Sequence, residues 1–220
     1  MQIAVLNPNS SRKVTASMQD CLAPLIAATR HAIICDTLDE GPEGIETDQH
    51  VADVAPLVVD YVRRTEADAY VIACFSDPGV EQARKATGKP IFGIAESAYC
   101  AALLHGARFG VVSLGPSSIT RHLARIEGLG LSTRLAGDRS VDMTVAEAND
   151  VDAARAAVTR TGKDLIDKDG AEVLILGCAG MGGHRPALQA ALGHVVIDPV
   201  QAAVANAISA LDLDYTRKGS

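Results

Sequence analysis

Two cysteines in this chain stand where an apolar run gives way to a tight turn. Cys74 follows the run 69–73 and precedes Phe-Ser-Asp-Pro-Gly, and Cys178 follows the run 172–177 and precedes Ala-Gly-Met-Gly-Gly. Nearly half of the 220 residues separate them. Backbone N–H groups at the start of a helix favour a thiolate and commonly lower a cysteine pKa below its free value of about 8.5. The pattern predicts two reactive thiols that work on one substrate from opposite sides.

The residues around the two cysteines favour proton transfer over acyl transfer. None of the six histidines stands at matching places near both cysteines, whereas nucleophilic catalysis usually needs a nearby base. After Cys74, Asp77 is expected to cap the next helix, with Pro78 at its first position. After Cys178, the glycines at 180, 182 and 183 expose N–H groups that suit an oxygen gaining negative charge.

Short apolar runs alternate with helical patterns along the whole chain, which is typical of an α/β protein with parallel sheets. The near-continuous Val, Ile and Leu content of the runs predicts strands buried on both faces. The expected strands are 2–6, 32–35, 69–74, 90–94, 108–113, 132–135, 173–176 and 194–197. The expected helices include 51–64, 80–87, 97–105, 118–127, 151–168, 186–192 and 200–211.

A weak internal repeat predicts two similar lobes, each a four-stranded parallel sheet flanked by helices, related by a pseudo-twofold duplication. The first lobe is expected to span 1–98 and the second 99–204, with a C-terminal helix at about 205–220 packing back on the first lobe and a frayed tail from 216. Ligands of open α/β sheets bind beyond the carboxyl ends of the strands. The active site is therefore expected in the cleft between the lobes.

Composition excludes several partners. Hydrophobic residues make up 48% of the chain, aromatic residues only 3%, and the net charge is −7 without a basic block. These values disfavour nucleic acid and anionic membranes, and no apolar run approaches the roughly 18 residues that span a bilayer. Five cysteines, an odd number without a C-x-x-C motif, indicate a reducing cytoplasm. A homo-oligomer is compatible with the apolar helices.

At these residues the chain resembles the aspartate/glutamate/hydantoin racemase superfamily, most of all its hydantoin and allantoin racemase branch. The matching stretches are Asn-Pro-Asn-Ser at 7–10, Gly-Pro at 41–42, Ile-Glu at 45–46, Cys-Phe-Ser-Asp-Pro-Gly at 74–79, Gly-Ile-Ala-Glu at 93–96 and Leu-Gly-Cys-Ala-Gly-Met at 176–181. The resemblance implies two lobes with the site between them, no metal, no cofactor and a small-molecule substrate. It also implies that Cys74 and Cys178 form an acid/base pair.

The same resemblance implies a set of substrate-binding residues. Backbone N–H groups of Phe75, Ser76, Ala179 and Gly180 would hold an enolate oxygen. Further side chains and turns would line the cleft, namely Asn7, Ser10, Ser113, Gly115 and Ser117. Asn7 and Ser10 have a competing interpretation as turn and cap residues.

The residues after the cysteines bear on the substrate. Amino-acid racemases of the superfamily carry a threonine or Asn-Thr there, whereas this chain has Phe75-Ser76 and Ala179-Gly180, which favours a neutral ring such as a 5-substituted hydantoin or allantoin. A maleate-type cis–trans isomerase and an aspartate/glutamate-type racemase stay open as alternatives. An arylmalonate-type decarboxylase is less favoured because Cys74 is present, and a non-catalytic binding protein would make both thiols incidental.

Overall fold

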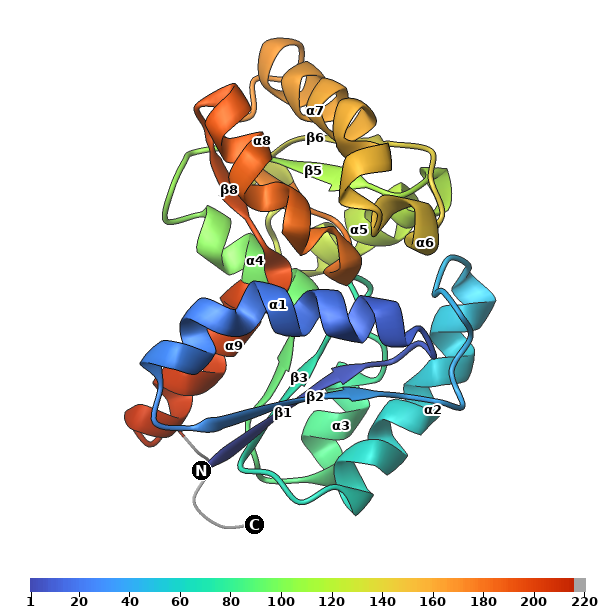
Figure 1. Cartoon of the computed structure of the whole chain (residues 1–220), viewed down its shortest axis with the longest axis vertical. Helices are drawn as coiled ribbons and strands as arrows, with labels where there is room; N and C mark the ends of the chain where they lie inside the picture. Colours follow the sequence, from blue (N-terminus) through green and yellow to red (C-terminus); the bar gives the residue numbers. More distant parts are fainter. Residues whose placement is uncertain (216–220) are drawn as a thin grey trace.

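The computed structural model describes residues 1–215 and contains two parallel sheets with helices packed on their faces (Figure 1). The elements of the first half are β1 Gln2–Asn7, α1 Arg12–Ala28, β2 Ala32–Thr37, α2 Asp48–Arg64, β3 Ala69–Ile72, α3 Val80–Ala86, β4 Ile91–Gly93 and α4 Ile94–Ala102. Those of the second half are β5 Phe109–Ser113, α5 Pro116–Gly128, the 3-10 turn η1 Ser132–Arg134, β6 Leu135–Ser140, α6 Val145–Ala148, α7 Val151–Asp167, β7 Val173–Leu176, the 3-10 helix η2 Ala179–His184, α8 Arg185–Leu192, β8 Val195–Ile197 and α9 Pro199–Asp212.

The two sheets have the same strand order. The first runs β2-β1-β3-β4 and the second β6-β5-β7-β8, and every neighbouring pair is parallel. The predicted α/β fold with two four-stranded parallel sheets is therefore confirmed. The central strands β3, β5 and β7 are buried at every position, because helices cover both faces of a parallel sheet.

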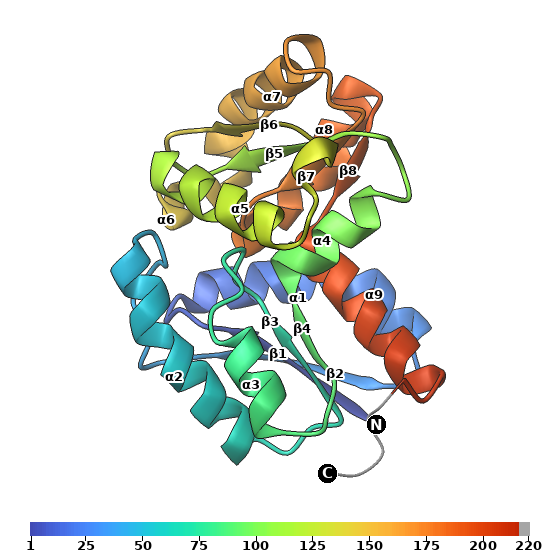
Figure 2. The same ribbon diagram turned by 180° about the vertical axis from the view of Figure 1, so that it is seen from behind.

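Alternating side chains of the first sheet enter two different cores. Ile3, Val5 and Val71 pack with α1, α4 and α9, whereas Leu6 and Ile72 pack with α2 and α3. Successive side chains of a strand point to opposite faces, so one sheet serves both cores. Figure 2 shows α2 and α3 together on the face away from α9.

The core that contains α1, α4 and α9 continues into the second half of the chain. Tyr99 of α4 stacks on Phe109 of β5 with ring centroids 5.5 Å apart, and Phe75 meets Tyr99 edge-on at 5.5 Å. The helix α9 contacts β1, β3 and β4 of the first sheet although it is the last element of the chain. The two sheets are thus held by shared packing, and the turns at their strand ends are placed by it.

The structure differs from the sequence prediction at two places. The strand predicted at 132–135 was wrong, because 132–134 form a 3-10 turn and the edge strand β6 follows at Leu135–Ser140. Its half-exposed, polar sequence lacks the apolar signal of a central strand. The C-terminal helix, predicted at about 205–220, is α9 and ends at Asp212; the predicted tail at 216–220 lies outside the described residues. No helix within 1–215 has the length and apolar character needed to cross a membrane.

Candidate active site

The two cysteines line one pocket between the carboxyl ends of β3 and β7. The space between protein atoms there, open mouth included, is about 410 Å³, of which about 30 Å³ can hold the centre of a water molecule. A charge on Cys178 raises the pKa of Cys74, so the two thiols are within electrostatic reach of each other. The lining residues are Asn9, Val14, Ile45, Ala73, Cys74, Phe75, Ser76, Leu114, Ser118, Arg121, His122, Val145, Gly177, Cys178 and Ala179.

The backbone forms the same turn after each cysteine. The carbonyl of Cys74 accepts from the N–H of Asp77 at 2.9 Å, and that of Cys178 accepts from the N–H of Met181 at 3.1 Å. The backbone N–H two residues further on, that of Ser76 in the first turn and of Gly180 in the second, lowers the pKa of each thiol. The duplicated fold therefore gives both thiols equivalent local partners.

Burial nevertheless dominates the protonation of both thiols. It raises the pKa of Cys74 to about 12 and that of Cys178 to about 11, although the N–H groups of Ser76 and Gly180 act in the opposite direction. The expectation that a helix start lowers these pKa values was wrong. The helix α3 begins only at Val80, and η2 is a short 3-10 helix, so neither thiol gains enough from a helix dipole to offset desolvation.

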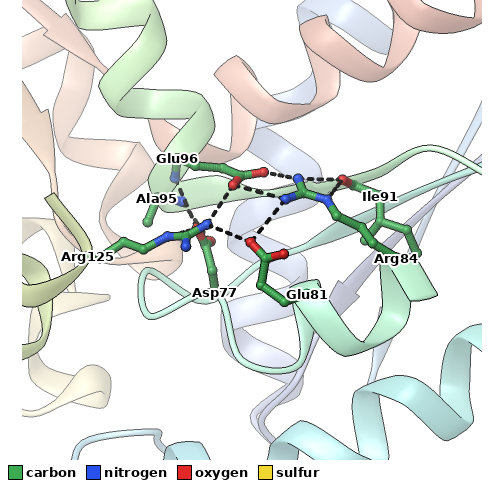
Figure 3. Close-up of polar contacts among 7 residues, drawn as sticks. All are labelled: Asp77, Glu81, Arg84, Ile91, Ala95, Glu96 and Arg125. Carbon is green, nitrogen blue, oxygen red and sulfur yellow. Dashed lines mark hydrogen bonds and ion pairs between the residues drawn. The ribbon is translucent and has the colours of Figure 1, made fainter. Parts of the chain in front are cut away.

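A buried carboxylate fixes the turn after Cys74 (Figure 3). Asp77 has φ +46°, and its oxygens accept the backbone N–H groups of Ala95 at 2.9 Å and Glu96 at 3.0 Å. It therefore caps α4, not the helix that follows it as predicted; the N-cap of α3 is Gly79. A Cβ on Gly93 would lie 2.3 Å from the Asp77 carboxyl carbon, so a side chain there is excluded.

The second lobe contains the same contact with the partners exchanged. Asp198 caps α9 by accepting the N–H groups of Val200 at 2.8 Å and Gln201 at 3.3 Å. A Cβ on Gly182, in the turn after Cys178, would lie 2.5 Å from the carboxylate of Asp198. In the first lobe the cysteine turn supplies the carboxylate, Asp77, and the helix start supplies the glycine, Gly93. In the second lobe the cysteine turn supplies the glycine, Gly182, and the helix start supplies the carboxylate, Asp198. Each cysteine turn is thereby packed onto the beginning of the helix that follows the last strand of its sheet, α4 after β4 and α9 after β8.

Charged side chains of α5 bridge to the first lobe. Arg125 donates to Glu96 at 2.7 Å and lies 4.0 Å from Asp77, and Arg84 also binds Glu96 (Figure 3). Burial raises the pKa of Asp77 to about 7, and the Arg125 charge opposes that rise. The network holds α5 against the loop that carries Cys74.

Arg121 is a pocket residue that sequence reasoning missed. Its guanidinium donates to the Ser76 hydroxyl at 3.3 Å, to Asp48 at 2.9 Å and to the Glu46 carbonyl at 3.3 Å. Its charge lowers the pKa of Cys74, whereas Glu46 raises that of Cys178. The only sequence signal was its spacing of four residues from Arg125 on one amphipathic helix, a spacing that puts both on the same helix face.

The predicted substrate-binding residues divide into two groups. Phe75, Ser76 and Ala179 line the pocket, whereas the other six are not among its lining residues, namely Asn7, Ser10, Ser113, Gly115, Ser117 and Gly180. The amide of Asn7 donates to Asn9 at 2.8 Å and to Thr15 at 3.1 Å. These bonds agree with the interpretation of Asn7 as a turn and cap residue. The hydroxyl of Ser117 donates to the Glu46 carbonyl at 2.9 Å.

Comparisons with known proteins agree with this geometry. The sequence profile of the Asp/Glu/Hydantoin racemase family matches residues 3–207. The chain belongs to this family. It is 37% identical to a hydantoin racemase of Paenarthrobacter aurescens over 98% of this chain and 93% of that protein.

Solved structures agree over almost the full length. The allantoin racemase from Klebsiella pneumoniae superposes with a TM-score of 0.91 at 30% identity, covering 97% of this chain and 89% of that one. The allantoin racemase from Pseudomonas fluorescens superposes with a TM-score of 0.93 at 29% identity, covering 99% and 94%. The predicted family is confirmed, and the chain is an isomerase of the racemase type.

Proposed function

We propose that this racemase inverts the carbon next to a carbonyl in a hydantoin-type ring, such as a 5-substituted hydantoin or allantoin, with Cys74 and Cys178 as the acid/base pair. The observation that carries the proposal is that two thiols on equivalent turns line one pocket. Relatives that are hydantoin and allantoin racemases support the substrate class.

The reaction needs one thiolate and one thiol. The thiolate takes the proton from the ring carbon, the C–H electron pair moves into the enolate, and the opposite thiol delivers a proton to the other face. Burial raises the pKa of both thiols, which makes the thiolate a stronger base toward a weakly acidic carbon. Each cysteine acts as the base for one enantiomer.

The pocket lining supports a neutral ring over a free amino acid. Among the described lining residues there is no aspartate or glutamate that could pair with a substrate ammonium group. The one arginine there already binds Ser76, Asp48 and a backbone carbonyl. A ring with amide N–H and carbonyl groups can bind to backbone and hydroxyl groups without a counter-charge.

The test is racemisation in heavy water. Single enantiomers of 5-methylhydantoin, allantoin and aspartate are incubated with the protein, and optical rotation and deuterium at the stereogenic carbon are followed. We expect loss of rotation together with deuterium uptake for a ring substrate. No exchange with any of the three would refute the proposed function.

Variants of the thiols test the pairing. Cys74→Ser and Cys178→Ser should each abolish racemisation, whereas Cys100→Ser, at an exposed position, should not. Full racemisation by either of the first two variants would contradict the acid/base pair. Because the proposed reaction uses no cofactor, activity should survive dialysis against EDTA. We place the enzyme in the cytoplasm, where its free cysteines would stay reduced.

A further inference from the structure

A buried histidine forms part of the pocket wall and has no role in the two-thiol reaction. The ring of His122 lies on α5, lines the same pocket as both cysteines and meets Phe75 edge-on with centroids 4.9 Å apart. Its side chain is 2% exposed, and that of its partner Asp138 is 1% exposed. Such a charged pair is costly to bury, and here it borders the residue that follows Cys74.

The hydrogen bonds of this cluster define where its protons are. Nδ1 of His122 lies 2.9 Å from Asp138 Oδ2 and 3.1 Å from the Ser113 hydroxyl oxygen. The single hydroxyl proton of Ser113 goes to the other carboxylate oxygen of Asp138. Nδ1 must therefore be a donor, because both of its neighbours offer it only lone pairs.

The charge of the cluster follows from the same bonds. Both oxygens of Asp138 accept, so the carboxyl is ionised, and the imidazole is the only cationic side chain bonded to it among the described residues. A buried carboxylate requires a paired positive charge. Nδ1 is thus committed to Asp138, and the second ring nitrogen, Nε2, points away from that carboxylate.

We propose that His122 is a catalytic residue whose Nε2–H binds the substrate carbonyl oxygen that becomes the enolate oxygen, with Asp138 and Ser113 as its positioning residues. The inference rests on the proposed function. When the thiolate removes the carbon-bound proton, the electron pair enters the enolate and negative charge develops on that oxygen. The imidazolium balances the charge through the hydrogen bond and keeps its proton, and the second thiol returns a proton to carbon. Arg121 has four of its five N–H donors engaged by protein groups, so His122 is the donor that we assign to the substrate.

Two variants separate this role from a structural one. In His122→Asn the amide nitrogen can replace Nδ1 toward Asp138, but nothing replaces Nε2. We expect kcat for 5-methylhydantoin to fall about 100-fold with KM changed little, as for loss of an oxyanion donor. The double variant His122→Leu/Asp138→Val removes the whole ion pair and should fold with an equal or higher Tm, while showing the same loss of kcat.

The outcomes distinguish the two proposals. His105→Asn, at an exposed position, is the matched control and should keep the parent activity. An active parent enzyme with fully active His122→Asn and double variants would overturn the role of His122 alone. A parent enzyme that racemises no ring substrate would overturn the proposed function and the role of His122 with it. Should the variants fail to fold, ¹⁵N spectra of the parent decide the matter, because 5-methylhydantoin must shift the Nε2 resonance of His122, and an unmoved resonance excludes the contact.

Discussion

The buried thiols make a specific prediction about how racemisation depends on pH. Catalysis in either direction requires one thiolate and one thiol in the free enzyme. Burial raises the pKa of Cys178 to about 11 and that of Cys74 to about 12. At neutral pH both groups are therefore thiols, and the thiolate fraction limits kcat/KM.

The size of the effect follows from these pKa values. Below the lower pKa, the thiolate fraction grows tenfold for each pH unit, so kcat/KM should rise about 100-fold between about pH 7.5 and about pH 9.5. Cys74 remains protonated over this range because its pKa is higher, so the acid partner is not lost. The two thiols by themselves give a continuous rise over this range, without the falling limb of a bell-shaped profile.

The assay follows the optical rotation of single enantiomers of 5-methylhydantoin or allantoin at low substrate concentration. A Cys74→Ser/Cys178→Ser double variant in the same buffers measures the racemisation that hydroxide causes alone. A profile that is flat from about pH 7.5 upward would refute the reasoning, because it would mean that a thiolate already exists near neutral pH despite burial.

Three further variants test the contacts around the pocket. Asp77→Asn keeps one hydrogen-bond acceptor of two, so we expect the free energy of unfolding at pH 5 to fall by about 1 kcal/mol, measured by thermal unfolding. This difference should shrink towards pH 8. Burial raises the pKa of Asp77 to about 7, so the parent itself loses stability between about pH 4 and 7 as the carboxyl ionises. Arg125→Met breaks the 2.7 Å contact with Glu96. Because the pair is partly exposed, we expect the free energy of unfolding in urea to fall by at most about 1 kcal/mol. Salt should reduce this loss, and an equal loss at high salt would contradict an electrostatic origin. Gly182→Ala puts a Cβ 2.5 Å from the carboxylate that caps α9 and should cost about 1–3 kcal/mol, whereas Gly88→Ala, with nothing within 4 Å, should be tolerated.

The fold was largely predictable because its signals are local. The runs before Cys74 and Cys178 are apolar enough to indicate central strands, and the turn residues after them mark where those strands end. The order of elements in two matching halves then predicts two sheets. The edge strand Leu135–Ser140 was missed because one side of an edge strand is unpaired and its sequence need not be apolar.

Part of the site could not be predicted, because its contacts join residues far apart in sequence. Asp77 was expected to cap the helix after it and instead caps a helix that begins at Ile94. The sequence around His122 did not mark it as a site residue, because its contacts are with residues of other segments. It bonds to Asp138 of β6 and packs against Phe75 in the pocket wall.

The sequence by itself determined that two cysteines end equivalent strands of a duplicated α/β fold, because strand ends and turns depend on residues that are adjacent in the chain. The tertiary structure alone decided what those thiols are chemically. Their pKa values depend on desolvation by the packed lobes and on charges such as Arg121 and Glu46, which come from other segments of the chain. Local N–H groups favour the thiolate in both turns, and burial by the rest of the molecule outweighs them.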